Sequence, residues 1–384
     1  MSVRDSIEQI VRRGGSEREY FPEALFRYIL KQALASGLER LDRPIYATWN
    51  VITQCNLHCS FCSAGARATG GMISNPVAPR IARMLSKVGV RHVALLGGEP
   101  TLCEELGESV AIMDRCGVFV ELVTNGSGLD LQLARVLLHL GPRVRVKVSL
   151  DSYDEETNDS MRGRGAFRYA VDACAVLASV GVPFRVQSVI TEANELHIAA
   201  TMAFANDLGA RSYGFTPVIP MGRAAFARGL SLSEAALSQV ADLMVNADRF
   251  STALEKFSLG CSWMAEIESA SARLAPLNAV EADLNSRLKC NALRTRVHVD
   301  ANGDVYPCDY LKDERFRCGN LLADEFAEIW GSSVARVVNG LRRANKERCR
   351  QCERYTCDTG CAAVVASVSR HDPSVVAFCD LCGR

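Results

Sequence analysis

The feature that most constrains this chain is the placement of its cysteines. Of its 16 cysteines, three lie within Cys55–Cys62 and nine within Cys290–Cys382. The N-terminal residues lack the apolar stretch of a signal peptide, so we expect a cytoplasmic chain. Clustered cysteines in such a chain indicate metal binding rather than disulfides. The isolated Cys103, Cys116 and Cys174 are instead expected to be small, buried apolar residues.

The first group of cysteines has the spacing of an iron–sulfur site. Cys55, Cys59 and Cys62 form a C-x3-C-x2-C pattern that directly follows a β-rich segment, residues 47–53. Three thiolates can bind three irons of a [4Fe–4S] cluster and leave the fourth iron open to a substrate or cofactor. The alternative is zinc with His58 as a fourth ligand. Because His58 adjoins Cys59, that pair has poor geometry for one shared metal.

Strand-like and helix-like runs alternate after these cysteines, which predicts an α/β fold with a parallel sheet. Six such units predict an open, partial (β/α)6 barrel rather than a closed eightfold one. Ligands of such sheets lie at the carboxyl ends of the strands, where the cysteines fall. After residues 47–53, strands are expected at 91–96, 118–123, 144–150, 183–190 and 212–217, and helices near 78–88, 104–116, 129–140, 166–180 and 195–208.

The chain divides into four expected parts. In the last part, residues 297–306 predict a β-hairpin turned at Asn302-Gly303, and one helix is expected near residues 323–340. The remaining loop-rich segment would need metal binding to constrain it. The parts are an N-terminal helical extension (1–43), a core (44–225), a helical bridge (226–284) and a small cysteine-rich domain (285–384).

The cysteine motif resembles that of the radical S-adenosylmethionine (SAM) superfamily, and the resemblance covers about residues 45–225. Members carry C-x3-C-x2-C after the first strand of a partial (β/α)6 barrel, with an aromatic residue, here Phe61, before the last cysteine. A second shared motif is Gly97-Gly98-Glu99-Pro100, at the end of the second strand. In the family this motif binds the SAM amino group through backbone carbonyls.

Further stretches match family patterns and imply contacts with SAM. Thr124-Asn125 and Ser149-Leu150-Asp151 are implied to face the ribose and methionine, and Arg162 to reach the carboxylate. Phe215-Thr216-Pro217 is implied to lie near the adenine. The chemistry implied is reductive cleavage of SAM to methionine and a 5′-deoxyadenosyl radical, which abstracts hydrogen from an unactivated carbon.

The C-terminal cysteines resemble those of the SPASM domain, which implies two auxiliary iron–sulfur clusters of the [4Fe–4S] type. This chain has four residues between Cys352 and Cys357, where the family usually has five. The fourth ligand of the first cluster stays open between Cys261, Cys318 and a site open to substrate, and Cys382 is a spare candidate. A zinc-ribbon-like fold is the alternative. The implied ligands are Cys290, Cys308 and Cys361 for one cluster and Cys349, Cys352, Cys357 and Cys379 for the other.

One carboxylate near these cysteines is a candidate catalytic residue. Tyr306-Pro307-Cys308-Asp309-Tyr310 resembles a stretch of the sulfatase-maturating enzymes, which implies that Asp309 accepts a proton from the oxidised substrate. The alternative is a capping or solvated carboxylate.

The resemblance implies an oxidoreductase that oxidises or crosslinks a residue of a ribosomally made peptide or protein, as a maturase in natural product biosynthesis. The alternatives are a dehydrogenase of a small molecule, such as an aminocyclitol, and a non-catalytic iron–sulfur or zinc protein. The helical residues 1–43 are short for a fused precursor-binding domain, which weakens the peptide hypothesis. An external reductant of the flavodoxin or ferredoxin type is expected. With 44 basic and 44 acidic residues and no long apolar run, we expect neither a nucleic acid nor a membrane partner.

Overall fold

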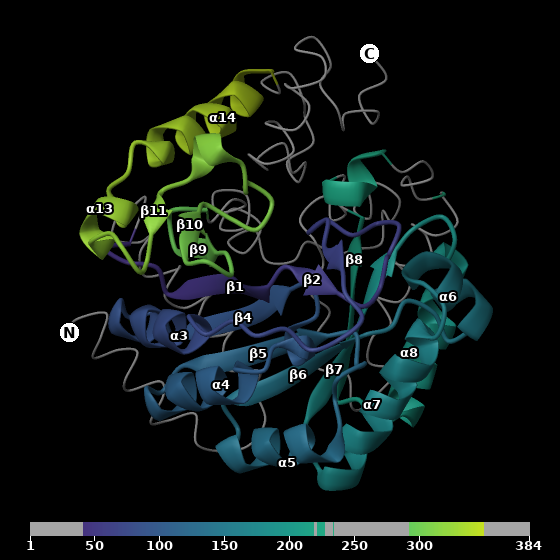
Figure 1. Ribbon diagram of the computed structural model, residues 1–384. Helices are drawn as coiled ribbons and strands as arrows, with labels where there is room; N and C mark the ends of the chain where they lie inside the picture. The colour runs from purple at the N-terminus through teal and green to yellow at the C-terminus, as the bar shows by residue number, and fades with distance from the viewer. Residues whose placement is uncertain (1–40, 219–220, 227–232, 234–291, 349–384) are drawn as a thin grey trace, which may run out of the picture.

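The structure, a computed structural model, describes residues 41–218, 221–226, 233 and 292–348 (Figure 1). The expected helical extension and helical bridge lie almost wholly outside these residues. Of the expected cluster ligands, Cys290 and those from Cys349 onward lie outside them as well, as do Cys261 and Cys382.

Within the described residues, six parallel strands in chain order form the body of one curved sheet, as the sequence predicts. The expected α/β class with a partial (β/α)6 barrel is therefore confirmed. The strands are β1 (Tyr46–Ile52), β4 (His92–Gly97), β5 (Phe119–Thr124), β6 (Val144–Ser149), β7 (Phe184–Ile190) and β8 (Ser212–Pro217).

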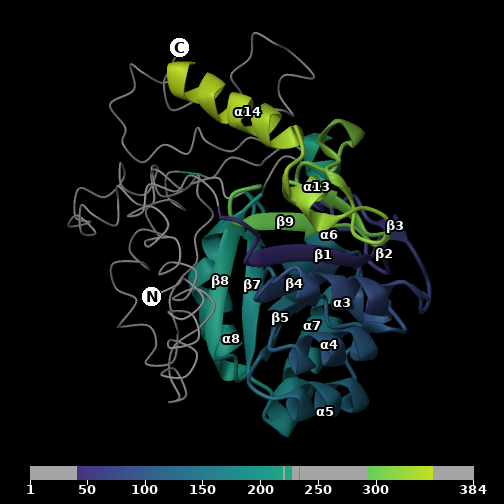
Figure 2. The same ribbon diagram turned by 90° about the vertical axis from the view of Figure 1, so that its left-hand side faces the viewer.

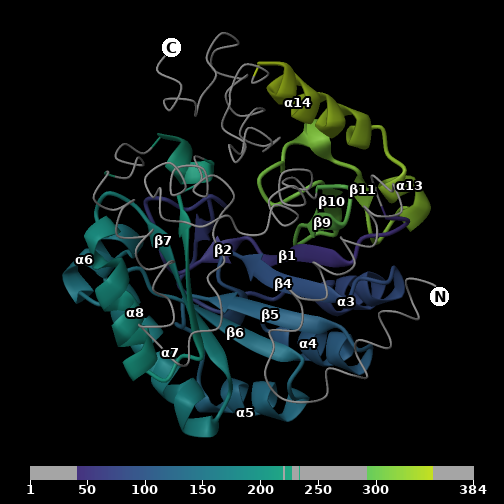
Figure 3. The same cartoon turned by 180° about the vertical axis from the view of Figure 1, so that it is seen from behind.

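Helices cover the outer face of this sheet (Figures 1 and 3). Five of them match the expected helices within a few residues: α3 (Ala78–Lys87), α4 (Leu106–Arg115), α5 (Leu131–Leu140), α7 (Ala166–Val180) and α8 (Ile198–Asp207). A sixth, α6 (Glu155–Arg162), was not predicted, because its polar sequence EETNDSMR has no apolar stripe. It begins at Asp154, whose carboxylate accepts a hydrogen bond from the Thr157 amide at 2.8 Å.

The two faces of each strand differ in chemistry. Side chains directed at the helices are apolar and fully buried, such as Trp49, Leu95 and Leu122. Side chains on the inner face are largely polar, and Glu121 pairs there with Lys147 at 2.9 Å. Alternate residues of a strand point to opposite faces, so each strand presents an apolar face to the helices and a largely polar face to the interior of the barrel.

The C-terminal part extends the same sheet, which the sequence did not predict. Strand β9 (Arg296–Val299) pairs parallel with β1, from Tyr46 opposite Arg296 to Trp49 opposite Val299. Strands β10 (Asp304–Tyr306) and β11 (Gly319–Asn320) follow antiparallel. Figure 2 shows β9, β1 and β4 side by side in one layer.

The hairpin of β9 and β10 confirms the predicted one, but its turn differs. The Gly303 amide donates to the Asp300 carbonyl at 2.9 Å, and the Asp300 amide to the Asp304 carbonyl at 2.8 Å. These bonds close a three-residue loop, Ala301–Gly303, rather than a two-residue Asn302-Gly303 turn. Gly303 has φ 90°, the conformation that favours glycine in such loops.

The prediction of a single helix near residues 323–340 is wrong. The segment forms α13 (Phe326–Trp330) and α14 (Val334–Arg348), separated at Gly331, whose amide caps α13 through the Ala327 carbonyl at 2.9 Å. The remaining short elements are β2 (Gln54–Cys55), β3 (Arg67–Ala68), η1 (Pro100–Leu102), η2 (Glu195–His197), η3 (Gly222–Phe226) and η4 (Glu314–Phe316).

The isolated cysteines are only partly as expected. Cys103 and Cys174 are buried, which confirms their prediction as small core residues. Cys116 is exposed, so its prediction as a buried residue is wrong. It follows the last residue of α4 and lies beyond the buried stripe of that helix. Among the described residues, none of the helices is both long enough and apolar enough to cross a membrane.

Candidate active site

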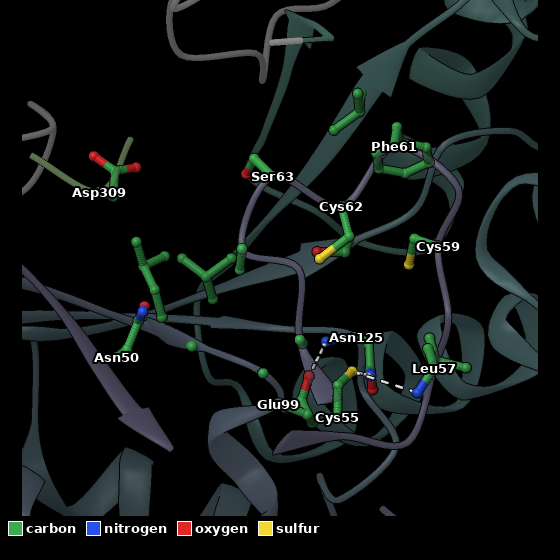
Figure 4. A pocket seen from close by; sticks show the side chains of 18 of the residues that line it. Asn50, Cys55, Leu57, Cys59, Phe61, Cys62, Ser63, Glu99, Asn125 and Asp309 are labelled. Carbon is green, nitrogen blue, oxygen red and sulfur yellow. Dashed lines mark hydrogen bonds between the residues drawn. The ribbon is translucent and has the colours of Figure 1, made fainter. Parts of the chain in front are cut away.

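The three N-terminal cysteines line one open pocket at the carboxyl ends of the strands (Figure 4). Residues from the ends of all six barrel strands complete its floor, as expected for a parallel sheet. Most of the predicted SAM-binding residues are among the lining residues, which include Gly97, Gly98, Glu99, Thr124, Asn125, Ser149 and Arg162.

Residues 55–66 carry the three cysteines and are called the cysteine loop. This loop fits an iron–sulfur cluster better than zinc. Burial raises the pKa of the Cys59 thiol to about 11 and also raises that of Cys55, so metal binding must displace protons from both. His58, the possible fourth zinc ligand, is exposed and does not line the pocket. Three thiols with no histidine facing the same pocket are the donor set of a cluster with one open iron.

The two glycines of the second motif are required by the backbone. A Cβ atom on Gly97 would lie 2.2 Å from the Ile52 carbonyl oxygen, and one on Gly98 would lie 1.6 Å from that of Gln54. The Gly98 amide donates a hydrogen bond to the Ile52 carbonyl at 2.9 Å, and the Glu99 amide donates one to the Gln54 carbonyl at 2.8 Å. The motif therefore packs directly on the segment that leads into Cys55. Pro100 then begins η1.

The Glu99 carboxylate connects the ends of strands β4 and β5 by hydrogen bonds. It is 2% exposed and accepts hydrogen bonds from the Thr101 amide and hydroxyl, the Thr124 hydroxyl at 2.6 Å and the Asn125 amide at 2.7 Å. Burial raises its pKa, and these donors oppose that rise by stabilising the charge. With its oxygens engaged inside the protein, the side chain fixes the positions of Thr124 and Asn125.

Asn125 connects the third strand to the cysteine loop. Its side-chain amide donates to the Asn56 side chain at 3.0 Å and approaches the Cys55 sulfur at 3.7 Å. The same Asn56 oxygen accepts from the Ser127 hydroxyl at 3.1 Å. Asn56 was not identified from the sequence, although its position directly after the first motif cysteine was a usable signal.

Arg162 lines the pocket while it is held by a buried carboxylate. Its guanidinium forms two bonds with Asp151, at 2.6 and 2.7 Å, and lies 5.4 Å from the centre of the Phe61 ring. Asp151 also accepts from the Val189 amide at 2.8 Å. The positive charge of Arg162 lowers the pKa of Cys59, against the larger effect of burial. Asp151 is thus behind the pocket wall, and Ser149 and Arg162 face the pocket.

The opposite wall of the pocket comes from the C-terminal part of the chain. Asp309, Tyr310 and Lys312 line it, and Figure 4 shows Asp309 across the pocket from Cys59 and Cys62. They follow β10 in the chain and reach this place because β9 pairs with β1. The Asp309 carboxylate accepts a 2.5 Å bond from Arg296.

Arg296, which anchors this wall, was not identified from the sequence. Its guanidinium lies 5.3 Å from the centre of the Tyr46 ring, and its partner Asp309 raises its pKa against the opposing effect of burial. Arg296 stands on β9 opposite Tyr46 on β1, a pairing that no local pattern indicates. Of the remaining expected cluster ligands, the described residues include Cys308, which is buried close to Asp309.

Comparisons with known proteins agree with this geometry. The radical SAM superfamily matches residues 49–205, and the SPASM iron–sulfur cluster-binding domain matches residues 290–353. Mycofactocin maturase MftC of Mycobacterium ulcerans is 32% identical over 328 residues, which cover 84% of each chain. AdoMet-dependent heme synthase of Methanosarcina barkeri is 25% identical over 333 residues, or 84% of this chain and 92% of the relative.

The fold is also that of a solved structure. The crystal structure of Streptococcus suis SuiB bound to S-adenosylmethionine has a TM-score of 0.70 and 18% identity, and the match covers 96% of this chain and 85% of SuiB. The chain binds SAM, a [4Fe–4S] cluster and auxiliary iron–sulfur clusters, as these domains do. With its motif cysteines, glycine turn and C-terminal wall meeting at one pocket, it belongs to the radical SAM superfamily and is an oxidoreductase of the SPASM type.

Proposed function

We propose that this enzyme oxidises or crosslinks a residue of a ribosomally made peptide. The observation that carries the proposal is the shared pocket: Asp309 and Tyr310 line it together with Cys55, Cys59 and Cys62. A substrate bound there would touch both the site of radical formation and the C-terminal part. Chemistry at that junction suits a two-electron oxidation.

When bound and reduced, the cluster supplies the electron that cleaves SAM to methionine and the 5′-deoxyadenosyl radical. The chain's own groups would hold SAM: the carbonyls of Gly97 and Gly98 its amino group, Arg162 its carboxylate, and Thr124, Asn125 and Ser149 the ribose and methionine. The buried Glu99 and Asp151 would keep these groups in place without contacting SAM. This preorganisation limits the cost of positioning the cofactor.

Oxidation of the substrate requires an acceptor for a hydrogen atom, one for an electron and one for a proton. The 5′-deoxyadenosyl radical would take a hydrogen atom from a substrate carbon and become 5′-deoxyadenosine. Asp309, which Arg296 holds at the pocket wall, would accept one proton from the substrate, and an auxiliary cluster, when bound, would supply the acceptor for its electron.

The named relatives favour a peptide substrate. Besides mycofactocin maturase, the sporulation killing factor maturation protein SkfB of Bacillus subtilis is 29% identical over 207 residues, about half of each chain. The heme synthase relative favours the alternative, a small-molecule oxidation such as the dehydrogenase considered above, because its name indicates a non-peptide product.

The test is incubation of the reconstituted enzyme, SAM and a reductant with a short peptide encoded beside its gene. We expect a loss of two hydrogens in the peptide mass, together with 5′-deoxyadenosine. A variant with Cys55, Cys59 and Cys62 replaced by Ala is the matched control. Formation of 5′-deoxyadenosine with unchanged peptide, and turnover of a small molecule instead, would contradict the peptide proposal.

Several finer points belong to the same proposal. The electron would come from a flavodoxin or ferredoxin in the cytoplasm, with neither nucleic acid nor a membrane as partner. The four-part division of the chain stands as a prediction from the sequence pattern, and the SPASM ligands stand as predictions from the resemblance. Those ligands are Cys290, Cys308, Cys349, Cys352, Cys357, Cys361 and Cys379.

A further inference from the structure

The short helix η3 (Gly222–Phe226) lies against the cysteine loop, although some 160 residues separate the two in the chain. In Figure 1 it is the short teal helix above the end of β8. It was not predicted from the sequence. Its Arg223 lines the same pocket as the three cysteines.

Arg223 binds three carbonyls of the cysteine loop. Its Nε donates to the Cys59 carbonyl at 2.9 Å and its Nη1 to the Ala66 carbonyl at 2.8 Å. Its backbone amide donates to the Cys62 carbonyl at 3.0 Å. The guanidinium therefore spans the loop from before Cys62 to after it, which the fixed fork of an arginine allows and a lysine does not.

The loop depends on such outside partners because it has little regular structure of its own. Between Asn56 and Ala66 the backbone forms no helix or strand, so many carbonyls lack the partners that a helix or sheet would supply. A second anchor lies on the other side, where the Ser60 amide donates to the Met161 carbonyl of α6 at 3.0 Å. The loop is thus held between α6 and η3.

Two further contacts seat η3 on the loop. Ala224 is fully buried in an apolar cluster with Phe61, Met161 and Val218. Gly222 has φ 59°, and a Cβ atom there would lie 2.5 Å from the carbonyl oxygens of Cys62 and Ser63. Only glycine permits this close approach, so apolar packing, backbone contact and the arginine fork all act at one place.

We propose that Arg223 is a positioning residue that holds the cysteine loop in its cluster-binding conformation. Outer residues that orient metal ligands typically change metal affinity about 10- to 100-fold when they are replaced. Arg223 acts through the backbone beside two ligands, Cys59 and Cys62. Its role does not depend on which substrate the enzyme modifies.

The test measures how fast the core cluster loses iron, and not turnover. The full-length variants Arg223→Met, Arg223→Lys and Gly222→Ala are reconstituted anaerobically and challenged with an iron chelator. The signal followed is the part of the reduced electron paramagnetic resonance spectrum that changes on addition of SAM, because SAM binds the open iron. Arg143→Met is the matched control, since Arg143 pairs with Asp114 on α4 rather than with the cysteine loop.

We expect Arg223→Met to lose the SAM-responsive signal about 10- to 100-fold faster than the parent. Arg223→Lys should fall between them, since it keeps the charge but cannot span both carbonyls. Gly222→Ala should lose the signal faster although Arg223 is intact, because its Cβ forces η3 away from the loop. Circular dichroism of each apo-variant controls for folding.

Parental release rates in both Arg223→Met and Gly222→Ala would overturn the proposal, as would an equal loss in Arg143→Met. If Arg223→Met does not fold, the ranking of Arg223→Lys and Gly222→Ala against Arg143→Met decides the matter. Peptide modification is not measured, so failure here is distinct from failure of the peptide proposal.

Discussion

The core strands β1 and β4 to β8 and the added strands β9 to β11 belong to one sheet, yet they join it in different ways. In the core, each strand of the barrel pairs with the next barrel strand along the chain. A helical segment connects the two strands of each pair. In the C-terminal part, β9 pairs with β1 across about 250 residues, Tyr46 opposite Arg296. Local patterns can therefore predict the first arrangement and not the second.

The difference matters because the pocket lies where the two regions meet. The core supplies the three cysteines and the strand-end residues, whereas the added strands supply Asp309 from the opposite wall. The Thr48 hydroxyl and the buried His298 ring, 2.9 Å apart, connect the two regions below the pocket. Four predictions separate what each region contributes.

The largest effect is expected from replacing the three proposed ligands of the core cluster. Replacing Cys55, Cys59 and Cys62 by Ala should reduce 5′-deoxyadenosine formation to background while auxiliary iron stays bound. Iron analysis and liquid chromatography after anaerobic reconstitution measure both. Loss of all iron would mean that the auxiliary sites depend on the core cluster, and persistent cleavage would refute the ligand assignment.

Next is the buried ion pair behind the core wall. Asp151→Leu leaves Arg162 with an unpaired charge and should lower the free energy of unfolding by about 3–5 kcal/mol. The double variant Asp151→Leu, Arg162→Met should recover much of that loss, since no buried charge remains. Chemical denaturation of the apo-proteins measures both, and equal stability of the single and double variants would argue against a charge effect.

At the opposite wall, Asp309→Asn should separate radical formation from product formation. Cleavage of SAM should continue, whereas product should form about 100-fold more slowly, because the proposed proton acceptor is lost. Asp114→Asn on α4 is the matched control. Product formation at the parental rate would reduce Asp309 to a structural partner of Arg296.

The smallest effect is a pH-dependent loosening of the added strands. Burial lowers the pKa of His298, so the folded protein holds it neutral while the unfolded chain binds a proton below about pH 6.5. Its contribution to stability is thus present above that pH and is lost as the pH falls towards the depressed folded pKa. Hydrogen exchange should show β9 amides opening before β5 amides between pH 7 and 5. Equal change in both strands would contradict this order.

Some elements could be predicted from the sequence and others could not, because they differ in their apolar spacing and in the residues at their ends. Helix α7 was predicted at its observed bounds because Gly165 and Gly181 flank it and its apolar residues recur at helical spacing. Helix α6 has no such stripe, and its Asp154 cap was overlooked. Gly331 ends α13 with ordinary helical dihedrals, so the sequence did not reveal the break before α14.

The site shows the same division. Its pocket-lining motif residues could be predicted because they lie at successive strand ends, which a parallel sheet gathers at one edge. Arg296 and Arg223 could not, because each depends on contacts between segments far apart in the chain. Asp151 was expected to face SAM with Ser149, but the pair it forms with Arg162 places it behind the wall.

The most direct test of the account is an anaerobic reconstitution of the unmodified chain with iron and sulfide. Iron is counted per chain, and 5′-deoxyadenosine is then assayed after addition of dithionite and SAM. The account predicts about 12 irons, as three four-iron clusters require, together with SAM cleavage. Little iron, tightly bound zinc and no 5′-deoxyadenosine would contradict it.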